Sequence, residues 1–338
     1  MTTPWGDLAA RARGLGTHLL RRDELDALAA MPDVDALADA FRSRGLVAAD
    51  SRASAEQLER AVRRAAAARL RVLSRWAGDR EAALAIIFAD EDRRSVRALL
   101  RGAVQHADPD DRVAGLIPTP TLPERALTQL AAQPAAAAIA TLLVAWNHPF
   151  GPALLPLATG TQPDLLTMEL RLDAAFAAQA LRGARASHQR DLVAYVRETI
   201  DLENASAALV LATHEGELRP GDAFIRGGAR LTLPGYLDAI DARGVGEAGR
   251  RLAAVFWPAA LAAVFERAVS ERAMVESALL RHRIAAQAAA ARRDPAGVAS
   301  IVWFAMRQRA EVIDLQRIIW GATLAVPHGV IDDLLVTA

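Results

Sequence analysis

The sequence predicts an all-α protein built from three related helical units. Ala, Leu, Arg and Glu, which favour helices, form long runs, and apolar residues recur at spacings of three and four. Clusters of β-branched residues, which favour strands, are few. A third observation, a pattern that recurs about every 110 residues, divides the chain into similar parts. The expected units are residues 1–112, 113–224 and 225–338.

The first long helix is predicted over residues 54–75, in SAEQLERAVRRAAAARLRVLSR. Ser54 is a typical residue at a helix start, and Gln57, three residues later, completes a capping box. Leu58, Val62 and Ala65 then follow on one face. The segment is therefore expected to be an amphipathic helix.

The recurring pattern is a helix with an acid and, three residues later, a small polar residue. Its copies are DRRSVRALLRG at 92–102, DLENASAALVL at 201–211 and EVIDLQRIIWG at 311–321. The acids are Asp92, Asp201 and Glu311, and the small polar residues are Ser95, Asn204 and Asp314. A general acid or base is not expected to become Ser and Asn in sister copies, so we interpret Asp314 as a structural residue.

A helix start recurs downstream at nearly the same interval. Thr121-Leu122-Pro123 and Thr232-Leu233-Pro234 each place a capping Thr before a Pro that the first helical turn tolerates. In the third copy, Pro327 precedes the apolar residues. The N-terminal stretch LLRRDELDAL, residues 19–28, resembles the same starting helix without its upstream partner. The N-terminal segment is therefore a candidate to complete the third unit. Loops are expected at residues 108–111, 147–152, 219–222, 226–228 and 294–295.

Composition excludes several classes of function. The 40 basic and 40 acidic residues cancel, so the chain lacks the positive excess that nucleic-acid binding requires. All the basic residues are Arg, and without Lys neither a P-loop nor Schiff-base catalysis is possible. The chain has no Cys, which excludes disulfides and thiolate ligands and fits a cytoplasmic protein.

The sequence is not expected to cross a membrane. Its longest uncharged apolar run, Leu252 to Phe265, is broken by Pro258. At about 14 residues it is too short for a bilayer, which requires about 20, and we interpret it as a kinked core helix. The N-terminal MTTPWGDLAARARG lacks the apolar region of a secretory signal.

Two acidic clusters leave an enzymatic alternative open. Asp90-Glu91-Asp92 and the group Asp108, Asp110 and Asp111 could bind Mg²⁺ in a helical diphosphate synthase, although solvated helix ends are the favoured explanation. The seven His residues form no metal-binding motif, and no nucleophile elbow occurs. No cofactor is expected. A second alternative is an unrelated helical scaffold whose repeats form an open solenoid.

Four segments, taken in order, resemble a known family. The C-terminal segment carries an acid, a small polar residue, Leu, an aliphatic residue and Gly before a Pro-led helix, here Glu311, Asp314, Leu315, Ile318, Gly321 and Pro327. The other segments are Ala12-Arg13-Gly14-Leu15 with the Leu19–Leu28 helix, Arg97–Gly102, and Ile200–Asn204. This combination is similar to the C subunit of prokaryotic V-type and A-type ATPases (ATP synthases), the relative of the d subunit of the eukaryotic V-ATPase. Trp320 stands where the family usually has an acid.

The resemblance implies a non-catalytic rotor subunit. Proteins of this family form a funnel of three similar helical domains with pseudo-threefold symmetry. The funnel lies on the cytoplasmic face of the membrane proteolipid ring and receives the central shaft, so that torque couples ATP hydrolysis or synthesis to ion movement. The chain would then be a monomer within this complex and reach the membrane only through protein contacts. Arginines on or just after the repeated elements are the expected partner contacts, namely Arg97, Arg101, Arg226 and Arg317.

Overall fold

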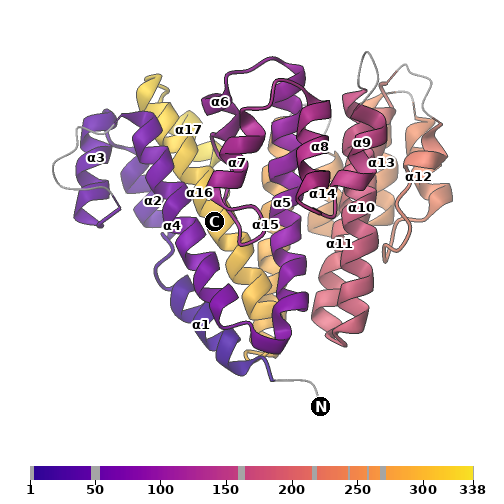
Figure 1. Cartoon of the computed structure of the whole chain (residues 1–338), viewed down its shortest axis with the longest axis horizontal. Helices are drawn as coiled ribbons and strands as arrows, with labels where there is room; N and C mark the ends of the chain where they lie inside the picture. Colours follow the sequence, from indigo (N-terminus) through magenta and orange to yellow (C-terminus); the bar gives the residue numbers. More distant parts are fainter. Residues whose placement is uncertain are drawn as a thin grey trace. The chain divides into compact units, whose positions relative to one another are not determined.

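The computed structural model describes residues 4–46, 54–158, 164–214, 219–242, 244–256, 259–266 and 272–337. Over these ranges the regular elements are α-helices and two 3-10 helices, without strands, which confirms the predicted all-α class (Figure 1). The chain divides into two compact units. The terminal unit comprises Met1–Leu84, Val113–Leu127 and Arg283–Ala338, and the central unit comprises Ala85–Arg112 and Thr128–His282.

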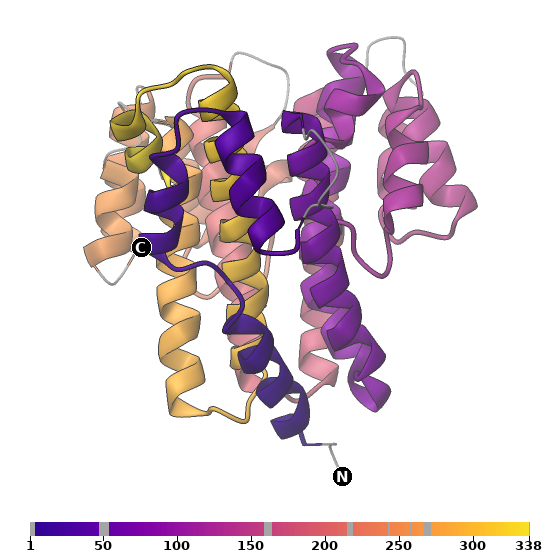
Figure 2. The same ribbon diagram turned by 90° about the vertical axis from the view of Figure 1, so that its left-hand side faces the viewer.

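The terminal unit is assembled around one long C-terminal helix. Its helices are α1 (Gly6–Gly16), α2 (Arg22–Ala29), α3 (Val34–Ser43), α4 (Ala55–Arg75), η1 (Gly78–Arg80), α16 (Ala299–Thr323) and α17 (His328–Leu334). Helix α16 packs against α1, α2 and α4, so residues from both ends of the chain lie side by side (Figure 1 and Figure 2). Most residues of α16 are buried, as its apolar sequence on several faces requires.

The central unit contains two long antiparallel helices and a set of shorter ones. Its helices are α8 (Ala136–Ala145), α9 (Gly151–Ala158), α10 (Leu165–Ala186), α11 (Arg190–Leu211), η2 (Pro220–Ala223), α12 (Leu233–Ile240), α13 (Val245–Val255) and α14 (Ala259–Glu266). Four helices have residues in both units, namely α5 (Glu81–Val104), α6 (Pro109–Val113), α7 (Glu124–Ala131) and α15 (Arg272–Arg293).

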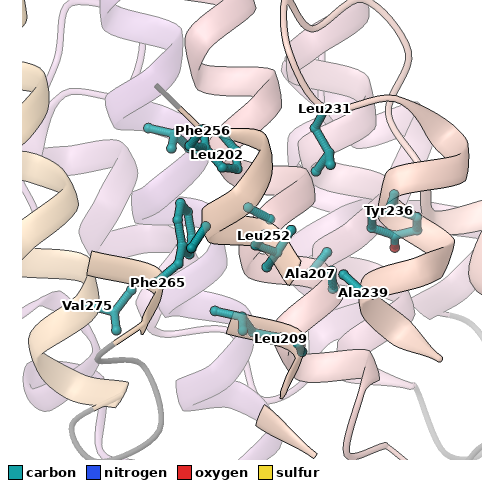
Figure 3. Packing of buried hydrophobic residues seen from close by; sticks show 14 of the residues in the cluster. Leu202, Ala207, Leu209, Leu231, Tyr236, Ala239, Leu252, Phe256, Phe265 and Val275 are labelled. Atoms are coloured by element: carbon teal, nitrogen blue, oxygen red, sulfur yellow. The ribbon is translucent and has the colours of Figure 1, made fainter. Parts of the chain in front are cut away.

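The apolar core of the central unit gathers side chains mainly from α11 to α14, with further ones from α10 and α15 (Figure 3). Tyr236, Leu252 and Phe265 are fully buried there, and the rings of Phe256 and Phe265 lie 4.8 Å apart. Burial of such aromatic side chains supplies a large share of the stability of a helical unit. This core fixes α12 and α13 against α11, which carries the second copy of the repeated pattern.

The predicted helix starts are found close to their expected places. Ser54 accepts a hydrogen bond from the Gln57 N–H and the Gln57 side chain accepts one from the Ser54 N–H, which confirms the capping box. Thr232 caps α12, and Pro327 immediately precedes α17. Three of the predicted loops are wrong in detail. Residues 109–113 form α6, residues 220–223 form η2, and Gly151 and Pro152 begin α9, because Pro is well suited to a first helical turn.

No helix in the described parts of the chain is long and apolar enough to cross a membrane. The apolar run that begins at Leu252 is divided between α13 and α14. Trp257 and Pro258, at the predicted kink, lie outside the described residues.

An ion pair near the N-terminus gives the terminal unit a predicted response to acid. The Arg80 guanidinium donates hydrogen bonds to the Asp7 carboxylate, one of them at 3.0 Å, and holds the pKa of Asp7 at about 2, below its ordinary value of 3.8. Because the folded pKa is depressed, the ionised carboxylate stabilises the fold above pH 4, and this contribution is lost as the pH falls towards 2.

We therefore expect Asp7→Asn to lower the free energy of unfolding at pH 7 by roughly 0.5 kcal/mol, a small value because the carboxylate is half exposed and screened by water. In urea titrations at pH 7, 4 and 3, the difference from wild type should shrink with the pH. Asp35→Asn, which changes an acid in the first turn of α3, is the control for a helix-terminus effect. A difference that is as large at pH 3 as at pH 7 would show that Arg80 is not the cause.

Candidate functional site

The second copy of the repeated pattern binds the loop before α12. The Asn204 amide donates to the Ile225 carbonyl and accepts from the Ile225 N–H, both at 2.8 Å. One turn earlier on α11, the Asp201 carboxylate accepts hydrogen bonds from the backbone N–H groups of residues 229, 230 and 231 at 2.8 to 3.1 Å. Asp201 and Asn204 are buried, and we call them the α11 polar pair. Burial raises the pKa of Asp201, against the effect of its backbone donors.

Two glycines allow the loop to approach α10 and α11. Gly227 has φ of +112°, a region that favours glycine, and a Cβ there would lie 2.6 Å from Leu181 Cδ2. A Cβ on Gly228 would lie 2.0 Å from the Asp201 Oδ1 atom. The turn predicted at residues 226–228 is therefore confirmed. Gly228 is required by the contact with Asp201, and Gly227 by its positive φ and its close approach to Leu181.

Gly228→Ala is expected to lower the free energy of unfolding by about 2 kcal/mol, because the methyl group displaces the loop from the Asp201 carboxylate. Urea unfolding followed by circular dichroism measures the loss. Gly221→Ala, in the same unit, is the matched control, since a Cβ there meets no atom within 4 Å. Equal stability of the two variants would contradict the close approach of Gly228 to Asp201.

The third copy binds both ends of the chain. Asp314 accepts hydrogen bonds from the Val336 N–H at 2.6 Å and the Thr337 N–H at 2.9 Å. Glu311, one turn earlier, accepts from the Leu20 N–H at 3.4 Å and pairs with Arg69 at 2.7 Å. We call the buried residues Glu311 and Asp314 the α16 polar pair. Burial raises the pKa of both carboxylates. Their hydrogen bonds support the structural role predicted for Asp314.

The α11 and α16 polar pairs each bind backbone groups of two separate stretches of chain, one of them directly before a short helix. In the central unit, the acid binds the backbone just before α12 and the small polar residue binds Ile225 upstream. In the terminal unit, Glu311 binds the backbone just before α2, and Asp314 binds the backbone of Val336 and Thr337, just after α17. Backbone groups far apart in the sequence, at Leu20 and at residues 336–337, therefore contact the α16 polar pair, whereas a single loop supplies both stretches that contact the α11 polar pair.

The first copy lies in the central unit and is built differently. Asp92 and Ser95 are buried on α5, and the Asp92 Oδ2 atom lies 3.8 Å from Nε2 of the buried His148. The Ser95 hydroxyl has no hydrogen-bond partner among the described residues. His148 also lies edge-on to Phe150, at 5.0 Å between ring centroids. The acid of this copy therefore faces an imidazole.

A buried charge network joins α5, α10 and α11 in the central unit. The fully buried Arg93 guanidinium binds Asp173 at 2.5 Å, Glu203 at 2.7 Å and Asp90 at 2.8 Å. The central carbon of the Arg93 guanidinium, Cζ, lies 5.0 Å from the centre of the Phe176 ring. Burial favours the protonated form of Glu203, but the charges of Arg93 and its neighbours outweigh this effect and hold the pKa of Glu203 at about 2. No motif in the sequence indicated this network.

The four predicted partner arginines lie in unlike surroundings. Arg97 belongs to the buried network and binds Asp173 and Glu203. Arg101 forms a bidentate ion pair with Glu169, with N–O distances of 2.5 and 2.7 Å. Arg317 donates to the Leu334 carbonyl. Arg226 is exposed, and among the described residues its side chain forms no ion pair.

Trp320, at the position where the resemblance predicts an acid, contacts a carboxylate. Its Nε1 atom donates to the Glu59 carboxylate at 3.1 Å, and the same carboxylate accepts from Gln316 at 2.6 Å. Glu59 is buried on α4. The acid therefore comes from another helix of the terminal unit, which the repeated pattern alone did not indicate.

The acidic clusters are not arranged as a metal site. Among the described residues, no group of three or more His, Cys, Asp or Glu side chains converges as metal binding would require. The Asp90 carboxylate binds Arg93, Arg94 and the Tyr195 hydroxyl, the last at 2.7 Å. These contacts neutralise the carboxylate and leave it poorly suited to hold Mg²⁺.

Together, these features define an all-α protein whose repeated polar residues bind its own backbone. The family model described as the ATP synthase (C/AC39) subunit matches residues 8–334, and the chain belongs to this family. The predicted resemblance to the C subunit of V-type and A-type ATPases is thus confirmed, and the protein is a rotary ATPase subunit. A comparison with curated proteins found no similar sequence.

Proposed function

We propose that the chain is a non-catalytic subunit of the central rotor. It would link the central shaft to the membrane proteolipid ring from the cytoplasmic side, and transmit the torque that couples ATP hydrolysis or synthesis to ion movement. The observation that carries this proposal is the family match over almost the whole chain. The buried carboxylates give further support, because Asp201, Glu311 and Asp314 bind backbone N–H groups of the chain itself.

We also propose three units, at residues 1–112, 113–224 and 225–338, arranged as a funnel with pseudo-threefold symmetry, with the N-terminal helix completing the third. Support comes from the matching contacts of the two polar pairs. Glu311 binds Leu20 before α2 as Asp201 binds Leu231 before α12. In addition, Arg22 of α2 donates to the Thr337 carbonyl at 3.1 Å. The N-terminal helix is therefore held by C-terminal residues.

Reconstitution tests the rotor role. A rotary ATPase purified without this chain should still hydrolyse ATP, because the catalytic head is intact, but should not drive ions into vesicles. Addition of the purified chain should restore pumping, and the tagged chain should pull down both the shaft subunit and the proteolipid ring. A chain that binds neither partner, or pumping that is equally efficient without it, would overturn the proposal.

A further inference from the structure

The loop before α12 presents exposed arginines on a fixed backbone. Arg226 and Arg230 lie on this loop, and Arg197 of α11 donates to its Gly228 carbonyl at 3.0 Å. All three side chains are exposed. We call Arg197, Arg226 and Arg230 the basic loop. Among the described residues, none of the three forms an ion pair.

The backbone under the basic loop is held on both sides. Asn204 binds both polar atoms of Ile225, directly before Arg226. Asp201 binds the N–H of Arg230 and of its two neighbours. A loop fixed in this way loses little conformational entropy when its side chains bind a partner, which favours affinity. Buried polar residues of the repeated pattern thus hold an exposed, positively charged surface in place.

Several other arginines of the central unit form ion pairs with acidic side chains. Arg93 and Arg97 bind buried carboxylates, Arg101 binds Glu169, and Arg250 and Arg251 both bind Glu247. In a chain with no net charge, arginines are commonly neutralised by nearby acids. Among the described residues, the side chains of Arg226 and Arg230 form no ion pair, so their guanidinium donors are available to an outside acceptor. The fixed backbone beneath them distinguishes them from other exposed arginines such as Arg171.

We propose that the basic loop is a docking surface for a carboxylate-rich segment of a partner protein in the rotor. This inference rests on the proposed function, and it adds the chemistry of the contact. Arg guanidinium groups match carboxylates with two parallel hydrogen bonds, which gives geometric specificity. The phosphates of a bilayer are a poorer match, because anionic lipid surfaces are bound by clusters of about four to eight basic residues. Here there are three, and the exposed Asp222 lies close by in sequence.

The test compares the full chain with the double variant Arg226→Glu and Arg230→Glu. Binding to the purified shaft subunit and to the detergent-solubilised proteolipid ring is measured by titration calorimetry. The double variant should bind one of these partners at least tenfold more weakly than wild type, and a short polyglutamate peptide should compete with that partner for wild type only. Arg171→Glu is the matched control, since Arg171 is exposed on α10 of the same unit. Circular dichroism should show equal folding of all variants.

The outcomes separate the two proposals. If wild type binds a rotor partner and the double variant binds it equally well, the docking surface is overturned while the rotor function stands. If the double variant instead loses binding to vesicles that contain phosphatidylserine, the acceptor is a lipid and the inference is wrong. If wild type binds neither shaft nor ring, both proposals fall.

Discussion

Arg93→Met is expected to lower the free energy of unfolding by about 3–5 kcal/mol, because it leaves buried carboxylates without their shared cation. Asp90, Asp173 and Glu203 all bind this one guanidinium, which is 0% exposed. The arginines that remain, Arg94 and Arg97, cannot balance three carboxylates. One negative charge would then stay buried, and the energy of desolvating it is large.

The variant should also respond to pH in a defined direction. Without Arg93, burial and mutual repulsion raise the pKa of the remaining carboxyl groups above the value of the unfolded chain. A raised folded pKa means that stability is regained as the pH falls, because the native state takes up the proton first. The deficit measured by urea unfolding should therefore be smaller at pH 5 than at pH 7.

Arg94→Met is the matched control for this experiment. Arg94 lies next to Arg93 on α5 and binds Asp90 at 2.8 Å, but its side chain is partly exposed. A loss of about 1 kcal/mol is expected, as for a partly solvated pair. Equal losses for the two variants, or no loss at all for Arg93→Met, would show that the network does not stabilise the central unit through its shared cation.

The repeated pattern was predictable from the sequence, whereas its contacts were not. The spacing of Asp201 and Asn204 from Glu311 and Asp314 identified equivalent helix positions and a structural role. It did not reveal which backbone groups they bind, because those groups lie about 20 to 30 residues downstream or at the other end of the chain. Such contacts depend on how the chain folds back, which helical periodicity does not encode.

The charge network could not be predicted for a different reason. Arg93, Asp173 and Glu203 lie on three separate helices, and a charged residue in a helix is normally exposed. Their sequence positions therefore resemble an ordinary solvated surface. The same reasoning placed Arg97 among the predicted partner contacts, although its guanidinium binds carboxylates of its own unit. Proximity to a repeated element did not distinguish internal from outward-facing arginines.

The identity of the small polar residue follows from the backbone groups it meets. Asn204 faces one carbonyl and one N–H of Ile225, so an amide, which both donates and accepts, satisfies both. Asp314 faces two N–H groups, those of Val336 and Thr337, so a carboxylate, which only accepts, satisfies both. The two side chains have nearly the same shape. They should nevertheless not be interchangeable.

Asn204→Asp is therefore expected to lower the free energy of unfolding at pH 7 by about 2–3 kcal/mol, because a carboxylate oxygen would replace the donor 2.8 Å from the Ile225 carbonyl oxygen. At lower pH, the protonated acid can donate to that carbonyl, so its folded pKa is raised and stability returns as the pH falls from 7 to 5. Asp314→Asn is the reciprocal control. It places an amide N–H against a backbone N–H, and this mismatch should show little dependence on pH over the same range, since the amide does not titrate. Urea unfolding at pH 5, 6 and 7 measures both effects. If Asn204→Asp were as stable as wild type at pH 7, the amide would not be binding both groups of Ile225, and the fixed backbone beneath the basic loop would lose its physical basis.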